Sequence, residues 1–184
     1  FLYFGINFIL MMFSYILVYM LEKTFGYVSP ISLVELANIS NPLLKKLSET
    51  TPGTFQHSLN VSILATEAAG SVNADTQLIR TGALYHDIGK MTNPGFFTEN
   101  QSGFNPHTQL TYIQSAQIII SHVTEGVKMA EKANLPQAVI DFIRTHHGKG
   151  KTKYFYNSYV NEHPDEEVDE KLFTYPGPNP FSKE

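Results

Sequence analysis

The chain has 184 residues, a formal net charge of −4 and no cysteine. The acidic balance excludes the strongly basic surface with which proteins bind long nucleic acids, and the lack of cysteine excludes disulfides, thiolate zinc sites and iron–sulfur clusters. A small anionic substrate would therefore need metal ions or a few local cations for its binding.

Residues 1–21 form an apolar block without a charged side chain. About 20 apolar residues span a bilayer as a helix, so we predict a transmembrane helix. A buried core helix is the alternative, whereas a signal peptide is disfavoured because the block lacks a basic start and a small-residue cleavage pattern. Since the apolar run starts at the first residue, we expect the chain to be part of a longer membrane protein. Lys23, Lys45 and Lys46 follow the block and favour a cytoplasmic position for the rest of the chain.

Residues 22–42 are expected to form a juxtamembrane connector, and residues 43–184 a single all-α domain, because no run of alternating apolar residues predicts a strand. Asn41, Thr51 and Asp75 are expected to cap helices, the first two just before a proline. One or two short helices are predicted between Ile31 and Ser48, and longer ones from Pro52 to about Ala69, from Thr76 to Lys90 and from Thr108 to His122. A break at Gly126 is expected to precede a helix from Val127 to Ala133, and the next helix is expected to start at Pro136. Two or more short helices and a closing loop are expected beyond Gly148.

Histidines lie on the apolar faces of four of these predicted helices. His57 precedes Val61 by four residues, on a face that also carries Leu64, Ala65 and Ala68, so its ring is expected to point inward. Small residues at 82 and 83 are expected to let a neighbouring helix come close. On the second helix, His86 shares a face with Ile79, Gly82 and Ala83. On the third, His122 shares a face with Ser115, Ile118 and Ile119. On the fourth, His146 and His147 follow Val139, Ile140 and Ile143.

These histidines and one aspartate are candidate metal ligands, because imidazole and carboxylate groups are the usual nitrogen and oxygen ligands of divalent transition metals. Taken singly, His57 is explained as a core residue and His122 as the partner of a helix C-terminus. Repetition on four helices favours a shared metal centre, which satisfies rings that are costly to bury unpaired. An aspartate between two histidine groups can bridge a pair of ions, a recurring arrangement for cleaving phosphate esters. The predicted ligands are His57, His86, Asp87, His122, His146 and His147.

The sequence HDIGK, at residues 86–90, resembles the motif of the HD-domain phosphohydrolases, and the later histidines resemble their binuclear branch. The segments PGTFQHS, GALYHDIGK, ENQ, NPH, IIISHV and RTHHG…YFY resemble the seven-transmembrane HD phosphodiesterases of the PgpH type, over about Leu43 to Pro180. The resemblance implies an HD-domain helical bundle that follows a transmembrane helix and lies on the cytoplasmic side of the cell membrane. It also implies hydrolysis of cyclic di-AMP to linear pApA.

The resemblance further implies two divalent metal ions that share Asp87. Nitrogen and oxygen ligands favour Mn or Fe, while Zn, Co and Ni stay open. The ligand set of the family ends with an aspartate on a later helix, and no aspartate follows Asp169, so we expect the domain to be truncated at its C-terminus and short of one ligand. Asp165 and Asp169 are expected to be solvated, His107 to brace the following helix and His163 to lie on the surface. The first ion would be held by His57, His86 and Asp87, and the second by Asp87, His122, His146 and His147.

Four further side chains are candidate substrate contacts, each with a structural alternative. Lys90, one turn after the HD pair and grouped with that pair as catalytic, would contact a phosphate or complement a helix C-terminus. Arg144 would reach a phosphate or lie on an exposed helix face. Tyr154 and Tyr156 would stack on a nucleobase or pack against the domain.

Two other functions stay open from the residues alone. An HD phosphohydrolase acting on cyclic di-GMP or a guanosine polyphosphate would use the same ligands, although the GYP-type segment of the cyclic di-GMP enzymes is missing after His147. A non-catalytic nucleotide-sensing HD domain would keep the fold, and is less favoured because no ligand position is substituted. No residue distinguishes adenine from guanine, and the sequence does not determine the oligomeric state.

Overall fold

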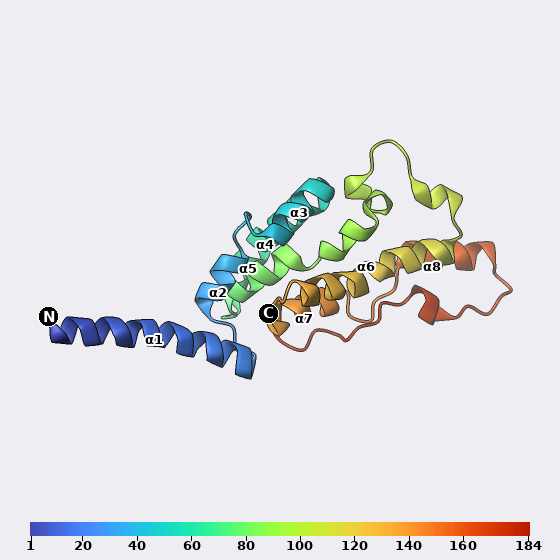
Figure 1. Cartoon of the computed structure of the whole chain (residues 1–184). Helices are drawn as coiled ribbons and strands as arrows, with labels where there is room; N and C mark the ends of the chain where they lie inside the picture. The colour runs from blue at the N-terminus through green and yellow to red at the C-terminus, as the bar shows by residue number, and fades with distance from the viewer.

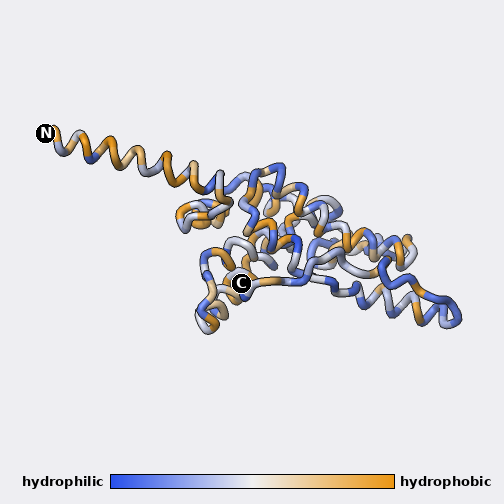
Figure 2. Tube along the Cα trace, turned by 90° about the horizontal axis from the view of Figure 1, so that it is seen from below, coloured by the Kyte–Doolittle hydropathy of each residue, from blue (hydrophilic) through white to orange (hydrophobic).

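The computed structural model covers residues 1–184 and contains eight α-helices, short 3-10 turns and no β-sheet, which confirms the all-α prediction. Helix α1 (Leu2–Phe25) projects from one end of the body formed by the other helices (Figure 1). Its large apolar side chains are exposed, and the helix is long and apolar enough to cross a membrane. Figure 2 shows it as a mainly hydrophobic trace. The helix ends at Gly26, whose φ of 66° is left-handed.

Two short capped helices join α1 to the body. Ser29 caps α2 (Pro30–Leu36), and Asn41 caps α3 (Pro42–Thr50) as predicted. Leu33 of α2 is buried in the main core. This part of the segment between α1 and α3 therefore packs on the body and is not a free linker.

Helix α4 (Pro52–Ser71) packs along α5 (Thr76–Tyr85). The predicted cap of α5 is confirmed, because the Asp75 carboxylate accepts hydrogen bonds from two backbone N–H groups of its first turn. Thr51 occupies the N-cap position of α4 as predicted, but its side chain makes no capping hydrogen bond. The Thr51 hydroxyl donates instead to the Leu47 carbonyl, at 3.1 Å, and so completes the end of α3.

Helix α5 is shorter than predicted, since it ends at Tyr85 and not at Lys90. His86 and Asp87 form the turn that follows it, and the chain continues as the 3-10 turn η1 (Ile88–Thr92). The HD pair thus stands at a helix end, where the backbone changes direction. The predicted loop after it is built from three more such turns, η2 (Pro94–Phe96), η3 (Thr98–Asn100) and η4 (Pro106–Gln109).

Helix α6 (Tyr112–Lys132) runs along the middle of the body (Figure 1). It starts later than predicted, with a capping box formed by Thr111 and Gln114. The predicted break at Gly126 is wrong, because the helix continues through this residue. Gly126 serves close packing instead, since a Cβ there would lie 3.2 Å from the backbone nitrogen of Gly89 in η1.

The last elements agree with the expectation of short helices and a closing loop. Helix α7 (Gln137–Thr145) begins directly after Pro136 as predicted, and it is followed by α8 (Lys153–Glu162) and the turn η5 (Glu170–Phe173). Figure 1 shows the chain after η5 running back toward α7, beside which it ends.

The main core surrounds the residue that precedes the HD pair. Tyr85 is fully buried, and its hydroxyl donates a 2.8 Å hydrogen bond to the Leu36 carbonyl of α2. One turn earlier on α5, the Thr81 hydroxyl donates to the Leu33 carbonyl at 3.1 Å. These bonds fix α2 to the helix that presents the HD pair. The core is completed by residues that include Leu44, Leu47, Ile88, Val139 and Ile143.

Candidate metal centre

Asp87 lies where the turn after α5 meets helices α4, α6 and α7, and its side chain is only 4% exposed. Its Oδ2 atom lies 3.1 Å from Nε2 of His86 and 3.9 Å from Nε2 of His57. Its Oδ1 atom faces the other way, 3.3 Å from Nε2 of His122 and 3.6 Å from Nε2 of His146. The two oxygens of one carboxylate are therefore divided between two groups of imidazoles.

Two clusters of potential metal ligands result, and in each the ligand atoms lie within 4.8 Å of one another. The structure thus brings together all six side chains that the sequence singled out, although they are spread over four segments of the chain. The first cluster is His57, His86 and Asp87, and the second is His122, His146 and His147.

Three of the rings are oriented by contacts between Nδ1 and the backbone carbonyl three residues earlier. Because a carbonyl only accepts hydrogen bonds, each Nδ1 carries a proton, and in the neutral ring Nε2 keeps its lone pair. The Nε2 atoms of His122 and His146 lie 3.2 Å apart, and Oδ1 of Asp87 is buried beside them without a hydrogen-bond partner. Electron-rich atoms that face one another in this way fit a metal cation. The three contacts join His86 to Ala83 (2.7 Å), His122 to Ile119 (2.5 Å) and His146 to Ile143 (2.9 Å).

The charge states also suit a metal. Burial lowers the pKa of His146 to about 3 and that of His147 to about 4. Burial alone would raise the pKa of Asp87, but its contacts with His122 and His86 outweigh burial and hold that pKa well below its usual range. Burial also opposes a charge on His86, yet the neighbouring Asp87 raises the pKa of that ring overall. The neutral rings of His146 and His147, beside an ionised carboxylate, are donors of the kind that divalent metals require.

Comparison with known proteins places this centre in a family. A family model described as the HD domain matches residues 54–174. The chain belongs to the HD-domain family. It is similar to the cyclic-di-AMP phosphodiesterases PgpH of Listeria monocytogenes serotype 1/2a (strain 10403S) and Bacillus subtilis (strain 168), at 44% and 42% identity, with each match covering 89% of this chain. The chain spans 23% of the length of each of these curated relatives.

A solved structure agrees with this HD-domain assignment. The crystal structure of the L. monocytogenes phosphodiesterase PgpH HD domain in complex with cyclic-di-AMP superimposes with a TM-score of 0.72 at 43% identity. The match covers 76% of this chain and 64% of that chain. The helical arrangement around the two histidine clusters is thus that of an HD domain.

His57 points toward Asp87 as predicted but is less buried than an inward-facing ring would be. Its side chain is 49% exposed, at the outer edge of the first cluster. The predicted apolar face of α4 is wrong, because Leu64 is 70% exposed. Periodicity of apolar residues misses the true face, since the side chains that α4 buries are mainly small and polar. They include Thr54, Ser58 and Ser62.

The predicted faces of α5 and α7 are confirmed. Gly82 and Ala83 are buried, and the ring of Phe142 occupies the space that a Cβ of Gly82 would take. This close approach of α7 to α5 brings the rings of His86 and His146 to within 5.1 Å of each other. On α7 itself the buried residues include Val139, Ile140 and Ile143.

Lys90 lies inside the HD site, with 13% of its side chain exposed. Its Nζ atom is 2.9 Å from Oδ2 of Asp87 and 2.8 Å from Oε1 of Glu99 in η3. Burial opposes the charge on Lys90, but the two carboxylates outweigh burial and raise its pKa. Glu99 also accepts a 3.1 Å hydrogen bond from the Thr54 hydroxyl at the start of α4. Sequence reasoning missed Glu99, whose only signal is its place in the ENQ segment.

The other candidate substrate contacts differ in their exposure and in the hydrogen-bond or ion-pair partners that they already have within the protein. Arg144 pairs with Asp141 on its own helix, and its side chain is 41% exposed. Tyr156 is also occupied, because its hydroxyl donates to Glu170 at 3.1 Å. Tyr154 is 73% exposed and lines a cleft between α6, α8 and the loop before α6. Tyr154 is therefore the most exposed of these three side chains.

Tyr175, in the closing loop, is a site residue that sequence reasoning missed. Its ring stacks on that of His147 with centroids 4.0 Å apart and planes at 15°, and lies edge-on to His122 at 6.1 Å. Burial raises the pKa of this phenol to about 12. Tyr175 therefore covers the second cluster with a neutral aromatic ring. No local sequence pattern marks it, because the contact depends on the return of the chain after η5.

The remaining charged and imidazole candidates lie outside the two clusters. His107 braces the loop and not the following helix as predicted, since its Nε2 lies 2.9 Å from the Phe96 carbonyl of the preceding turn η2. His163 was expected on the surface but is half-buried, because it stacks on a tyrosine of α8 at 4.4 Å. Asp165 and Asp169 are exposed as predicted, and the latter caps η5.

Proposed function

We propose that this HD domain hydrolyses cyclic di-AMP to linear pApA with two divalent metal ions, on the cytoplasmic side of a membrane. The observation that carries the proposal is the division of Asp87, whose oxygens face His86 on one side and His122 on the other. A carboxylate in this position can bridge two ions, and ion pairs about 3.5–4 Å apart recur in enzymes that cleave phosphate esters. The PgpH relatives, and the PgpH complex with cyclic-di-AMP, support the choice of substrate.

The ligand sets follow from the clusters, with Asp87 common to both. Nitrogen and oxygen donors without sulfur favour Mn²⁺ or Fe²⁺. When bound, two such ions supply water of lowered pKa and neutralise charge on the phosphate. The first would be held by His57, His86 and Asp87, and the second by Asp87, His122, His146 and His147.

The side chains of the chain contribute orientation and charge. Cleavage to pApA adds water at one phosphorus and breaks its P–O3′ bond, leaving a 5′-phosphate and a 3′-hydroxyl. Lys90 is a cation held beside the bridging carboxylate by Glu99, so we assign it a contact with the phosphate. The backbone contacts of Nδ1 hold three imidazole rings in the orientation that ligation needs, which removes the cost of reorganisation during the reaction.

The membrane assignment rests on α1 and on the charges that follow it. The helix carries no charged side chain up to Leu21, and Lys23, Lys45 and Lys46 follow the predicted span, which supports a cytoplasmic HD domain. Residues 22–42 would connect the membrane helix to the domain, with α2 already packed on it. Residues 43–184 would make up the HD domain proper.

The deciding experiment compares hydrolysis of cyclic di-AMP and cyclic di-GMP by the full-length gene product with added Mn²⁺. We expect selective cleavage of the adenine dinucleotide to pApA, and its loss on Asp87→Ala. Selective cleavage of cyclic di-GMP, or of a guanosine polyphosphate, would replace the substrate but keep the reaction class. Tight binding of a nucleotide without turnover, with two metals bound, would show a sensing domain and overturn the proposal.

A further inference from the structure

The start of α4 receives no cap from the residue at its N-cap position. Thr51 stands there, but its hydroxyl donates backward to the Leu47 carbonyl. The first N–H groups of a helix have no partner within the helix, and the N-cap side chain normally accepts one from the second or third residue. In α4 the third residue is Thr54, which is fully buried, so its N–H needs a partner from elsewhere.

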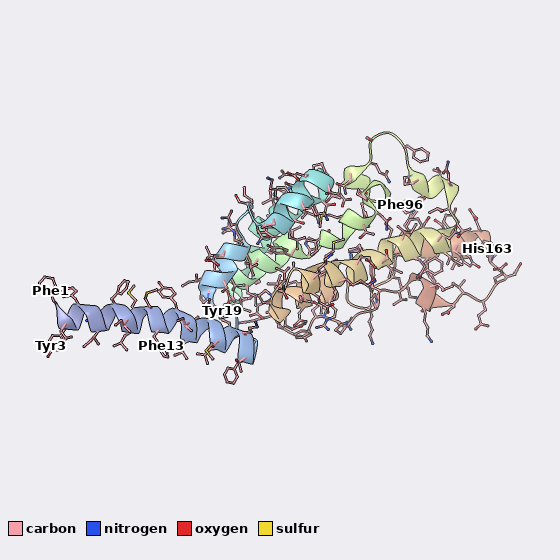
Figure 3. The ribbon with its side chains drawn as sticks, in the orientation of Figure 1. Phe1, Tyr3, Phe13, Tyr19, Phe96 and His163 are labelled. Atoms are coloured by element: carbon pink, nitrogen blue, oxygen red, sulfur yellow. The ribbon has the colours of Figure 1, made fainter.

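Asn100 of the turn η3 supplies that partner from a distant part of the chain. Its Oδ1 accepts a 3.1 Å hydrogen bond from the Thr54 N–H, and its Nδ2 donates a 2.8 Å hydrogen bond to the Thr54 hydroxyl oxygen. The loop that carries Asn100 lies at the end of the body opposite α1, where Figure 3 labels Phe96 of the preceding turn η2. Both ends of one amide thus fasten this loop to the first turn of α4.

Gly53 makes the close approach of η3 to α4 possible. A Cβ at position 53 would overlap the backbone carbonyl oxygen of Glu99 and would lie 3.0 Å from Oδ1 of Asn100. A residue with a side chain at this position must therefore push the turn and the helix apart. The sequence Gly53-Thr54 is fitted to the turn that carries Glu99 and Asn100.

The same contacts reach the first histidine cluster by two routes. The Thr54 hydroxyl donates to Oε1 of Glu99 at 3.1 Å, and this oxygen also accepts a hydrogen bond from Lys90. The Nζ atom of Lys90 lies 2.9 Å from Oδ2 of Asp87. Thr54 is also one helical turn before His57, whose Nε2 is 3.9 Å from the same Oδ2 atom. The contacts therefore form a ring that begins and ends at Asp87.

His57 depends on this ring more than the other ligands do. The imidazoles of His86, His122 and His146 are oriented by carbonyl groups of their own helices, and His57 lacks a contact of this kind. Its position beside Asp87 is therefore set by the helix that carries it. Anything that loosens the start of α4 should move His57 and leave the rings of the second cluster in place.

We propose that Asn100 is a positioning residue of the first cluster, which holds the start of α4, and with it His57 and Glu99, beside Asp87. This inference rests on the proposed two-metal centre and adds a residue that acts through others. Without the amide, the buried N–H of Thr54 loses its partner and the loop loses its attachment to the helix. The first ion should then bind more weakly, whereas the second should not.

The test measures the affinity of the full-length protein for Mn²⁺ by calorimetric titration, without substrate. We expect Asn100→Ala to weaken the binding of one ion about tenfold, as loss of an outer positioning contact does in other metal sites. Asn105→Ala is the matched control, because Asn105 also caps a turn of this loop but accepts its hydrogen bond from His107 within that turn. It should bind both ions as the wild type does. Wild-type affinity for both ions in Asn100→Ala would overturn the inference.

Gly53→Ala tests the same contact from the side of the helix. Its methyl group must separate η3 from α4 although Asn100 is intact, so it should weaken the binding of the same ion. Unchanged Mn²⁺ binding in Gly53→Ala would show that the approach of η3 to α4 does not position the first cluster.

A comparison of double variants separates positioning from a general loss of structure. In His147→Ala, which keeps the first cluster, Asn100→Ala should again weaken Mn²⁺ binding about tenfold. In His57→Ala, which keeps the second cluster, Asn100→Ala should change the affinity for the remaining ion by less than about twofold. An equal loss in both backgrounds would overturn the assignment. Because no measurement needs turnover, failure to hydrolyse cyclic di-AMP would overturn the proposed function and leave this inference standing.

Discussion

Gly89 of η1 lies against the His122 carbonyl group of α6 so closely that a Cβ at position 89 would overlap the carbonyl oxygen. On the same side of α6, Gly126 leaves room for the backbone of Gly89. The turn that carries Asp87 is thereby seated on the helix that carries His122. The glycine of the HDIGK sequence is therefore a packing residue, and it brings the Asp87 carboxylate to the second cluster.

Gly89→Ala should destabilise the protein and reduce its metal content together. The added methyl group must push η1 away from α6, and overpacking of a buried contact costs about 1–3 kcal/mol. Gly95→Ala is the matched control, because a Cβ there meets nothing within 4 Å and is expected to change stability by less than about 0.5 kcal/mol. Urea unfolding gives the free energy change, and elemental analysis gives bound Mn. Equal stability of the two variants would show that η1 does not need this contact.

Replacing the bridging carboxylate should cost both metal ions, whereas replacing a terminal ligand should cost one. We expect Asp87→Asn to lower bound Mn at both sites, because an amide is a weaker ligand than a carboxylate toward a divalent cation. His57→Ala and His147→Ala should each lower occupancy at one site, since they belong to different clusters. Elemental analysis after equilibration with Mn²⁺ measures the number of ions.

Asp141→Asn is the control for this series, as Asp141 is a carboxylate of α7 that pairs with Arg144 away from the clusters. It should keep both ions. Full retention of one ion in Asp87→Asn would show that Asp87 serves a single metal, and would remove the main support for a two-metal mechanism.

Much of the fold was predictable because helix boundaries depend on local chemistry. The starts at Pro42 and Pro52 follow from a fixed φ and a missing N–H, and the start of α5 follows from the Asp75 cap. The end of α5 and the continuity of α6 were mispredicted. Both lie beside the contact between Gly89 and Gly126, which joins segments far apart in the sequence and is not evident from local residue types.

The residues of the site were also predictable only in part. The six side chains of the two clusters were singled out from residue type and repetition. His57 faces Asp87 as predicted but stays half exposed, because α4 buries small polar side chains. Glu99 and Tyr175 were missed, since each reaches the centre from a loop whose path is set by tertiary contacts. The imidazole ligand candidates can be identified from residue type alone, whereas the groups that position them can be identified only in the folded structure.

Lys90 and Glu99 should affect different steps. Lys90→Ala removes a cation assigned to the phosphate, and loss of one charged hydrogen bond of about 1.5–3 kcal/mol should raise the KM for cyclic di-AMP roughly tenfold or more. Metal content should stay unchanged, and its loss would contradict the phosphate role. Glu99→Gln should instead weaken Mn²⁺ binding, because Lys90 then pairs more fully with the carboxylate of Asp87.

Calorimetric titration of Mn²⁺ tests the effect of Glu99. Glu125→Gln is its control, since Glu125 pairs with Lys128 on α6 and touches neither cluster. The amide of Glu99→Gln still accepts the hydrogen bond from Thr54, so loss of structure is not expected. An unchanged affinity for Mn²⁺ in Glu99→Gln would show that Glu99 does not govern the pairing of Lys90.

The metal-free protein should lose stability as the pH falls below 6.5. Burial lowers the pKa of His146 from 6.5 to about 3 in the folded state. Between these values the unfolded chain binds a proton at this ring that the folded chain does not. The free energy of unfolding should therefore fall by up to about 1.4 kcal/mol per pH unit for this group.

His86 acts in the opposite sense, because its pKa is raised in the folded state. Its contribution is present at low pH and is lost as the pH rises through the folded pKa, so it does not produce the loss expected below 6.5. Urea unfolding in EDTA, at values from about pH 7 to about pH 5, measures the slope. His146→Gln should reduce the slope by the share of this group, since glutamine does not titrate. The share of His147, whose pKa burial lowers to about 4, should remain. An equal slope in that variant would mean that the lone pair of His146 is not protected from protons, and that metal binding must compete with protonation at this ring.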